Sequence, residues 1–474
     1  MRHPGAGLVI AVLAAGCGDN LQPDPFLELV QVSGDTPFAP QCGGEAESGG
    51  VFAGVEVEPS VAADPTRPSH LVGAWQQDRW GNGGAHGVGT AASFDGGATW
   101  TLGIPHFGRC SPGNPEGAAD YERATDPWLT FAADGTVYVG ALVFDSTSAR
   151  NAMAVSRSAD GGVTWGEPAL LITDNDADVF NDKDTITADP TDAGRVYAVW
   201  DRLTGLTHPK DPTGTGPTYF ARMTDGVWEP ARAIIDPGAN AQTIGNVIAV
   251  LPDGTLVDVF NLITSANSDA PGNMVAVARS SDHGLTWSAP QTIAAMRGVG
   301  VRDPSNGDFI RSGTDLPEVA VDRASGALYI VWEDVQPGTA IDGVVLIRSL
   351  DGGVTWSAPS PVNRVPTAAA FTPVVAVASD GTVGVTYYDL RNAERDPHNF
   401  RSSAWLATSH DGGITWSEEA LGGAFDLAPA TLANIYFLGD YEGLATSGAM
   451  FLPFFVGTTF DASDRTDVFV RALK

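Results

Sequence analysis

Short runs of apolar residues that alternate with polar ones recur along the whole chain, and Gly, Asp or Pro bounds most of them. Val137-Tyr138-Val139-Gly140-Ala141 is one such run, and Ala133-Asp134-Gly135-Thr136 separates it from an earlier run at 126–131. Runs of this length with a period of two predict β-strands, and the Asp-Gly stretch between them predicts a tight turn. No stretch keeps apolar residues at helical spacing, so the sequence predicts an all-β protein.

This pair of strands, with its intervening turn, is repeated along the chain. Repetition of one supersecondary unit predicts an architecture in which equivalent units pack side by side. The copies are 58–64 with 71–75, 126–131 with 137–141, 184–189 with 196–200, 246–251 with 256–260, 317–322 with 328–332, 372–378 with 383–387, and 442–446 with 450–456.

A second repeat lies between these pairs. Its first copy is Ser93-Phe94-Asp95-Gly96-Gly97-Ala98-Thr99-Trp100, and four further full copies end at Trp165, Trp287, Trp356 and Trp416. The Asp can accept backbone hydrogen bonds in a tight turn, and Gly-Gly supplies the positive φ angles that the turn needs. Thr and Trp then begin the next strand, where the indole offers a large apolar contact. A degenerate copy lies at 224–228. When it is included, the aspartates of successive copies are 57 to 69 residues apart.

This eight-residue phrase resembles the Asp-box, or BNR repeat, of sialidases and related β-propellers. The resemblance covers roughly residues 50 to 474 and implies four-stranded blades around an axis. The seventh unit ends before its fourth strand, and residues 26–32 are the segment that would supply it. We therefore predict a seven-bladed β-propeller whose N-terminal strand closes the last blade and removes an exposed sheet edge. A six-bladed sialidase propeller is the alternative.

The first residues have the pattern of an export signal. Arg2 precedes an apolar run at 8–15, which is too short to span a bilayer. The run ends in Leu13-Ala14-Ala15-Gly16-Cys17, which resembles the lipobox of bacterial lipoproteins, although Ala14 stands where that pattern usually has Leu. The resemblance implies lipidation of Cys17, and a plain secretory signal is the alternative. The predicted segments are a signal peptide at 1–16, a lipid-anchor linker at 17–25 and the propeller at 26–474.

Composition agrees with export and narrows the choice of partners. Besides Cys17 the chain has Cys42 and Cys110, and an even remainder in an oxidising compartment predicts one disulfide. The net charge of −31 argues against binding nucleic acid or an anionic membrane surface. We therefore expect membrane contact only through the lipid anchor, at the outer membrane or cell surface, with secretion as the alternative. We also expect a monomer.

Polar residues gather at the starts of the first strands and the ends of the second strands. In a propeller these places share one face, and the Asp-box turns lie on the opposite face. Carboxylates, arginines and aromatic rings together suit a carbohydrate site, whereas a girdle of ion pairs that locks the blades is the alternative. The candidate ligand-binding residues are Arg123, Asp182, Lys183, Trp200, Arg202, Trp332, Asp389, Arg391 and Asp440.

The resemblance to sialidases suggests roles for some of these residues. Sialidases bind the carboxylate of the sugar with three arginines and use a Tyr, assisted by a Glu, as nucleophile. The chain departs from that family because Glu58-Pro59-Ser60 stands where sialidases have Arg-Ile-Pro. By position, the catalytic candidates are Tyr441 with Glu442, or Tyr388, with Asp126 as acid/base, and the clamp candidates are Arg123, Arg202 and Arg391.

One acidic loop is a candidate metal site. Asp174, Asp176 and Asp178 alternate with other residues, a spacing that suits the oxygen ligands of Ca²⁺. The loop lacks the Gly and the distal Glu of an EF-hand, so a solvated acidic loop is the alternative. No cofactor is expected to be required.

Two functions fit these observations. The first is a cell-surface propeller that engages extracellular glycans or glycoproteins, as an exo-acting glycoside hydrolase of the sialidase type. The second is a noncatalytic propeller that binds carbohydrate or protein at the cell envelope. A hydrolase needs two carboxyl groups, or a Tyr-Glu pair and an acid, about 5 to 10 Å apart across an open pocket. A binding module tolerates a mouth closed by salt bridges.

Overall fold

The structure is a computed structural model that describes residues 25–473, apart from 40–41, 43–49, 113–118, 206–213, 265–271, 337, 394–399 and 433–434. The signal peptide and Cys17 lie outside the described residues, so the lipid anchor stays a prediction. The described chain is all β except for one short 3-10 turn at Ala428–Ala430. Within it, no helix has the length and apolar character needed to cross a membrane.

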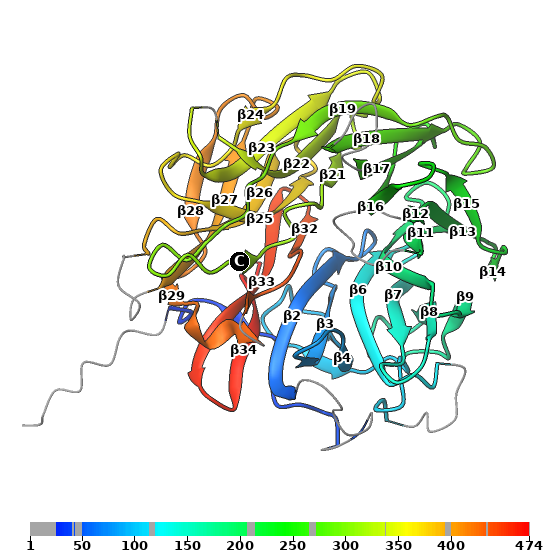
Figure 1. Cartoon of the computed structure of the whole chain (residues 1–474), viewed down its shortest axis with the longest axis horizontal. Coiled ribbons are helices and arrows are strands. Elements are labelled where there is room, and N and C mark those ends of the chain that lie inside the picture. Colours follow the sequence, from blue (N-terminus) through cyan, green and yellow to red (C-terminus); the bar gives the residue numbers. More distant parts are fainter. Residues whose placement is uncertain are drawn as a thin grey trace, which may run out of the picture.

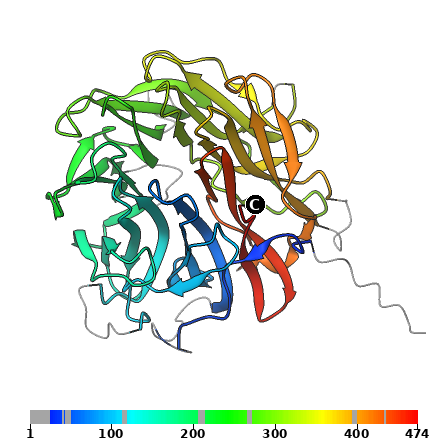
Figure 2. The same ribbon diagram turned by 180° about the vertical axis from the view of Figure 1, so that it is seen from behind.

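Antiparallel groups of strands follow one another around a central axis, so that the last group lies beside the first (Figure 1, Figure 2). The first groups are β2 (Val51–Ala63), β3 (Leu71–Trp80), β4 (Ala85–Ser93) and β5 (Thr101–Gly103); β6 (Arg123–Phe131), β7 (Val137–Phe144), β8 (Arg150–Ser158) and β9 (Ala169–Asn175); and β10 (Val179–Ala188), β11 (Arg195–Thr204), β13 (Thr218–Thr224), β14 (Val227–Trp228) and β15 (Arg232–Ile235).

The later groups repeat this order. They are β16 (Ala241–Val250), β17 (Leu256–Thr264), β18 (Gly272–Ser280) and β19 (Gln291–Met296); β21 (Glu318–Val321), β22 (Leu328–Val335), β23 (Asp342–Ser349) and β24 (Ser360–Pro361); β25 (Ala370–Val377), β26 (Val383–Asp389), β27 (Arg401–Ser409) and β28 (Ser417–Ala420); and β32 (Gly443–Ser447), β33 (Met450–Asp461) and β34 (Asp464–Val470). Short strands β1 (Val30–Gln31), β12 (Thr215–Gly216), β20 (Ile310–Arg311), β29 (Phe425–Asp426), β30 (Thr431–Leu432) and β31 (Ile435–Phe437) complete the fold.

Strand β7 shows how the alternating sequence builds the core. Val137 and Val139 pack with Val72 of the preceding group, whereas Tyr138 packs with Ile186 of the following group. Successive side chains of a strand point to opposite faces of its sheet. The strand is apolar on both faces because its sheet lies between two others, and burial of both faces holds the neighbouring groups together.

The two ends of the described chain meet in one group of strands. β1 pairs with β34, with Val30 opposite Val470, and β34 pairs in parallel with β2 at Val55. Before β1, the ring of Phe26 stacks on Phe469 with centroids 4.0 Å apart. The predicted pairing of the N-terminal segment with the last unit is therefore present, although the strand itself is shorter than the predicted 26–32.

The Asp-box phrases form turns on the outer parts of the groups. In one of them, Asp351 accepts hydrogen bonds from the Thr355 backbone N–H at 2.8 Å, the Thr355 hydroxyl at 2.6 Å and the Ser349 hydroxyl at 2.8 Å. These bonds hold the pKa of Asp351 well below its ordinary value. The Trp165 indole donates to the Thr90 hydroxyl of the neighbouring group at 2.9 Å. The repeated residues are thus used for turns and for contacts between groups.

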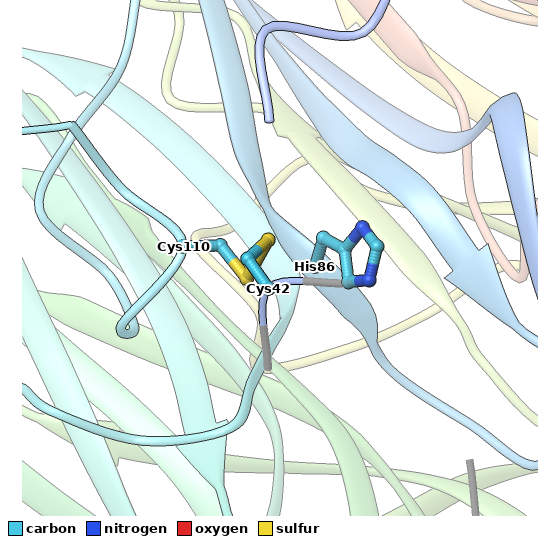
Figure 3. A group of neighbouring side chains, drawn as sticks. All are labelled: Cys42, His86 and Cys110. Atoms are coloured by element: carbon cyan, nitrogen blue, oxygen red, sulfur yellow. A yellow bond between two sulfur atoms is a disulfide. The ribbon is translucent and has the colours of Figure 1, made fainter. Parts of the chain in front are cut away.

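The predicted disulfide joins Cys42 to Cys110, whose Cα atoms are 5.3 Å apart. His86 lies beside the pair (Figure 3), and its Nδ1 is 3.1 Å from Asp78 Oδ2. The bond connects the segment before β2 to the segment after β5, across 68 residues of sequence. A cross-link over a loop of this length restricts the unfolded chain more than the folded one.

We expect the double substitution Cys42→Ser/Cys110→Ser to lower the free energy of unfolding by about 2 to 4 kcal/mol, because the unfolded chain gains entropy. Urea unfolding followed by tryptophan fluorescence measures this loss. Treating the wild-type protein with a reductant should give the same loss, and Cys17→Ser should give none. An unchanged midpoint in the double variant would contradict the prediction.

Candidate functional site

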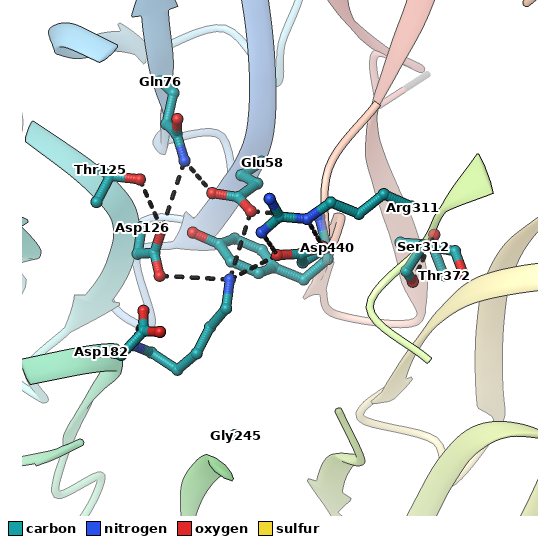
Figure 4. Close-up of polar contacts among 12 residues, drawn as sticks. Glu58, Gln76, Thr125, Asp126, Asp182, Gly245, Arg311, Ser312, Thr372 and Asp440 are labelled. Carbon is teal, nitrogen blue, oxygen red and sulfur yellow. Dashed lines mark hydrogen bonds and ion pairs between the residues drawn. The ribbon is translucent and has the colours of Figure 1, made fainter. Parts of the chain in front are cut away.

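Five of the innermost strands, β2, β6, β10, β16 and β25, carry a bulge at an equivalent position. Each shifts register against its neighbour at this position, and β2 has a second shift nearer its start. The residues at these shifts are Glu58, Asp126, Lys183, Gly245 and Thr372, with φ angles between 50° and 66°. Left-handed backbone in a non-Gly residue costs on the order of 1 kcal/mol or more and persists where its surroundings hold it. The bulges carry residues from different strands to one point near the axis (Figure 4).

Lys183 lies at the centre of this point. Its Nζ is 2.7 Å from Asp440 Oδ2, 3.4 Å from Asp126 Oδ2 and 3.5 Å from Glu58 Oε1 (Figure 4). Gln76 donates to Glu58 through the same amide group that approaches Asp126. We call Glu58, Asp126, Lys183 and Asp440 the axial cluster. It joins three carboxylates from three strand groups through one ammonium group.

Two arginines flank the axial cluster. Arg311 donates from Nε to Asp440 Oδ1 at 2.8 Å, and its side chain is 42% exposed. Pairing of β20 with β31 sets Arg311 opposite Phe437. The guanidinium groups of Arg79 and Arg311 lie 4.9 and 4.6 Å from the centre of the Phe437 ring. The exposed edge of the cluster is therefore cationic, although its buried part is rich in carboxylates.

The buried groups shift one another's pKa in opposite directions. Burial and the neighbouring Asp126 raise the pKa of Asp182 to about 6, and burial raises the pKa of Glu58 to about 8. Burial also acts to raise the pKa of Asp126, but the charge of Lys183 and the hydrogen bonds with Thr125 and Glu58 together outweigh it, and the pKa is lowered. Arg311 and Lys183 likewise hold the pKa of Asp440 well below its ordinary value. The site therefore brings proton-holding and ionised carboxyls together.

A cavity of about 620 Å³ lies along the axis, lined by the innermost strands beyond their bulges. Its walls combine apolar side chains with polar groups, and Glu318 and Glu442 are among the lining residues. It extends toward the turns that join first and second strands, where Asp64 and Pro190 lie. Burial raises the pKa of Glu318 to about 8.

The structure does not assemble the predicted three-arginine clamp. Arg123 donates to Asn82 Oδ1 at 2.8 Å and lies over the Trp80 ring. The other two arginines have carboxylate partners of their own and share none with Arg123. Arg202 binds Asp174, and Arg391 binds Asp389 and Glu418. Arg123 and Arg202 contact residues of the preceding strand group, and Arg391 contacts residues of its own group. The three arginines therefore do not meet as the predicted clamp.

The predicted aromatic platforms are also buried. Trp200 and Trp332 have no exposed surface, and the Trp200 indole donates to Asn181 Oδ1 at 2.8 Å. Asp389 is equally buried and accepts a hydrogen bond from Trp405 at 3.0 Å. Neither tryptophan offers a face on which a ligand could stack, because the alternation of each strand turns the ring into the core.

The predicted tyrosine candidates lie near the axis and are buried. Tyr388 donates to Glu442 Oε1 at 2.5 Å, and Glu442 accepts a second bond from the Val456 N–H at 3.1 Å. Tyr441 donates to the carbonyl of Pro127 at 3.2 Å. The Tyr-Glu pair is thus Tyr388 with Glu442, and not Tyr441 with Glu442.

The acidic loop is divided between two environments. Asp174 is engaged by Arg202 and also accepts a hydrogen bond from Asn181 Nδ2 at 2.9 Å. Asp176 is exposed and caps the N–H of Asp178 at 3.0 Å. The three carboxylates do not converge on one point, which contradicts the predicted metal site and favours the alternative of a solvated loop.

Four residues predicted from the sequence lie together in the structure: Asp126, Asp182, Lys183 and Asp440. Arg311 was not predicted, because it lies in the long irregular connection between β19 and β21 and belongs to no repeat. Glu58 was recognised as a polar residue at the start of a first strand, but it was not among the candidate ligand-binding or catalytic residues. The signal that could have found it is the alignment of Glu58-Pro59, Asp126-Pro127 and Thr372-Pro373 at the same place in their units, since each pair forms the bulge.

Comparison with known proteins agrees with the repeat. A model of the BNR/Asp-box repeat matches residues 407–418, which include the Asp411 turn. The chain therefore contains an Asp-box repeat, as the sequence predicted, within an all-β propeller-like fold.

Two curated relatives are xyloglucanases. One from Paenibacillus sp. is 28% identical over 247 residues, which is 48% of this chain and 21% of that protein. One from Acetivibrio thermocellus is 27% identical over 212 residues, which is 44% of this chain and 22% of that protein. The chain thus aligns with about a fifth of the length of these relatives.

Among solved structures, the chain is similar to a Hadza microbial sialidase, with a TM-score of 0.47, 16% identity, and coverage of 86% of this chain and 75% of that one. It is also similar to an α-L-arabinanase of Penicillium chrysogenum complexed with arabinobiose, with a TM-score of 0.48, 12% identity, and coverage of 94% and 98%.

We expect Lys183→Met to lower the free energy of unfolding by about 3 to 5 kcal/mol, because three buried carboxylates lose their shared cation. Urea unfolding at pH 7 measures the change. Arg471→Met is the matched control, since its ion pair with Glu419 is exposed and should be worth less than about 1 kcal/mol. Equal losses in the two variants would contradict a central role for Lys183.

The buried Glu318 should make stability fall as the pH rises. Its pKa is about 8 in the folded state, against an ordinary value of 4.5, so the folded protein holds a proton that the unfolded chain releases. The free energy of unfolding should therefore decrease between about pH 5 and 8. In Glu318→Gln this part of the decrease should vanish, as urea unfolding across that range will measure. Glu419→Gln, at an exposed site, should keep the wild-type slope, and parallel slopes for Glu318→Gln and the wild type would refute the prediction.

Proposed function

We propose that this protein is a carbohydrate-engaging β-propeller whose ligand meets the axial cluster from the side of Arg311. The observation that carries the proposal is the convergence of bulged strands on one mixed acidic and basic cluster. Three charged residues, Glu58, Asp126 and Lys183, hold costly left-handed backbone there, and such conformations gather at functional sites. The names of the two xyloglucanase relatives support a carbohydrate ligand.

The chemistry that best fits the cluster is hydrolysis of a glycosidic bond. This reaction uses one carboxyl that holds its proton and one that stays ionised. We assign Asp182, with its pKa near 6, as the proton donor and Asp126, kept ionised by Lys183, as its partner. The acid would protonate the leaving oxygen, and the ionised carboxylate would stabilise or attack the sugar carbon, or activate water.

The sugar that we propose first is neutral. A sialidase mechanism needs a tyrosine hydroxyl free to attack, whereas Tyr388 and Tyr441 are buried and donate to Glu442 and Pro127. It also needs a clamp for the sugar carboxylate, and the three candidate arginines are held apart. Sialosides are therefore the second substrate class that we propose, with Arg311 as the exposed cation for the acid group.

A noncatalytic binding propeller is the second candidate function. It is favoured by the three ion pairs that Lys183 forms with Glu58, Asp126 and Asp440. These ion pairs hold the carboxylates of the axial cluster in place. In that case Arg311, with its side chain 42% exposed, would contact the ligand while the buried carboxylates hold the strand groups in place.

We also propose that the strand groups form seven blades, with the fourth strand of the last blade supplied by β1. The pairing of β34 with both β1 and β2 supports this count. The disulfide supports export. We propose further that Cys17 anchors a monomeric propeller at the cell surface through a lipid.

The purified chain should be tested for release of reducing sugar from xyloglucan, arabinan and related oligosaccharides, with fluorogenic sialosides in parallel. Asp126→Asn should lower kcat by about 100-fold or more on the preferred substrate, as expected for a lost acid/base partner. Asp380→Asn, in a turn at the far end of β25, should leave kcat unchanged.

Binding separates the two candidates. Glycan binding that Arg311→Ala weakens, with no turnover of any substrate, would favour the noncatalytic propeller. Neither binding nor turnover across the panel would contradict the proposed function.

A further inference from the structure

A second group of carboxylates lies away from the axial cluster, at the seam between the last and first strand groups. It consists of Glu56 on β2 and Asp464 and Asp467 on β34. One oxygen atom from each of the three lies within 4.8 Å of the others. Thr466, between the two aspartates, bonds the backbone of Glu56 in both directions, at 3.0 and 2.8 Å. The three carboxylates are therefore held on paired strands rather than on a free loop.

These carboxylates lack a positive partner. No described Lys or Arg forms an ion pair with Glu56, Asp464 or Asp467. Glu56 is fully buried, and although Gln77 donates to its Oε1, its Oε2 has no hydrogen-bond partner. Asp464 Oδ1 is also buried without a partner. Gln31 and Ser33 both donate to Asp467 Oδ1 at 2.8 Å, so the hydrogen bonds to this group involve one of its two oxygens.

Burial without a counter-charge is unfavourable for ionised carboxylates. Burial and the two neighbouring aspartates raise the pKa of Glu56 well above its ordinary value, and burial raises the pKa of Asp467 to about 7. Such a group is stable when it holds protons or when it holds a cation. Glu56 Oε2 and Asp464 Oδ1 favour the cation, because neither oxygen has a hydrogen-bond partner in the protein.

We propose that Glu56, Asp464 and Asp467 bind one divalent cation, with Ca²⁺ preferred, at the seam that closes the propeller. Ca²⁺ takes oxygen ligands at about 2.3 to 2.6 Å, which places ligand oxygens within about 5 Å of one another, as they are here. Three carboxylates suit a doubly charged ion, and the site differs from the predicted loop at 174–178. The group Cys42, His86 and Cys110 carries no comparable proposal because both thiols are used in the disulfide.

The site would couple the cation to closure of the ring. Glu56 belongs to the first strand group, whereas Asp464 and Asp467 belong to the last, and Asp467 also binds Gln31 of β1. A cation shared by the three would therefore join segments that are more than 400 residues apart, as the bond between Thr466 and Glu56 already does with its separation of 410 residues. A ligand that binds the folded chain alone stabilises it by mass action.

The experiment uses the full exported chain, stripped with EDTA and dialysed. Thermal unfolding is followed with and without 100-fold excess of CaCl₂ or MgCl₂ over protein, and metal content is measured after gel filtration. We expect Ca²⁺ to raise Tm by about 3 °C or more, and to raise it more than Mg²⁺ does. After gel filtration, one Ca²⁺ ion should be retained per chain. An unchanged Tm with no retained metal would overturn the proposal.

Two variants test the ligands. Glu56→Gln and Asp467→Asn should each lose the retained ion and the rise in Tm, whereas Asp176→Asn, in the exposed acidic loop, should keep both. Without metal, Glu56→Gln should melt no lower than the stripped wild type, because the neutral amide has nearly the same shape as the protonated carboxyl that it replaces. A purely structural role for Glu56 predicts instead a lower Tm in EDTA and an undiminished response to Ca²⁺, and that result would also overturn the proposal. Neither outcome depends on carbohydrate binding.

Discussion

The ammonium group of Lys183 is the interaction on which the centre of this propeller depends. Three carboxylates from different strand groups converge within 3.5 Å of it, and mutual repulsion would otherwise separate them. The lysine reaches this point because β10 bulges and gives it a left-handed backbone. Charge and backbone conformation therefore support each other: the carboxylates hold the strained residue, and the strained residue brings the cation that keeps the carboxylates together.

The bulges of the innermost strands also divide the central axis into two environments. On one side the bulged residues form the charged axial cluster, which is exposed to solvent at Arg311. On the other side the regular part of each strand lines a cavity whose walls are partly polar and partly apolar. Because a bulge changes which side chains face inward, one strand can present a charged residue to the axial cluster at its start and line the cavity with its later residues. The Asp-box turns lie at the outer edge of this frame and stiffen it through their own hydrogen bonds.

The sequence repeats predicted the all-β fold, the strand pairs and the Asp-box turns, and the number of cysteines predicted the disulfide. Each of these depends on local spacing or on residue type alone. The site was predicted in part. Asp126, Lys183 and Asp440 were found because the strand starts align, but Arg202 and Trp200 were misplaced because one residue along a strand reverses the direction of a side chain. Arg311 could not be found in this way, since an irregular connection positions it. The bulges decide which residues meet, and bulges leave little trace in periodicity.

The meeting of β1 with β34 has a consequence for how the chain is made. During synthesis Val30 is made long before Val470. The edges of β1 and β2 that pair with β34 therefore stay unpaired until synthesis is nearly finished. Contacts of such large sequence separation form late in folding. The ring therefore closes only when the last strands have been made, even though each earlier group can form its own antiparallel pairs before then.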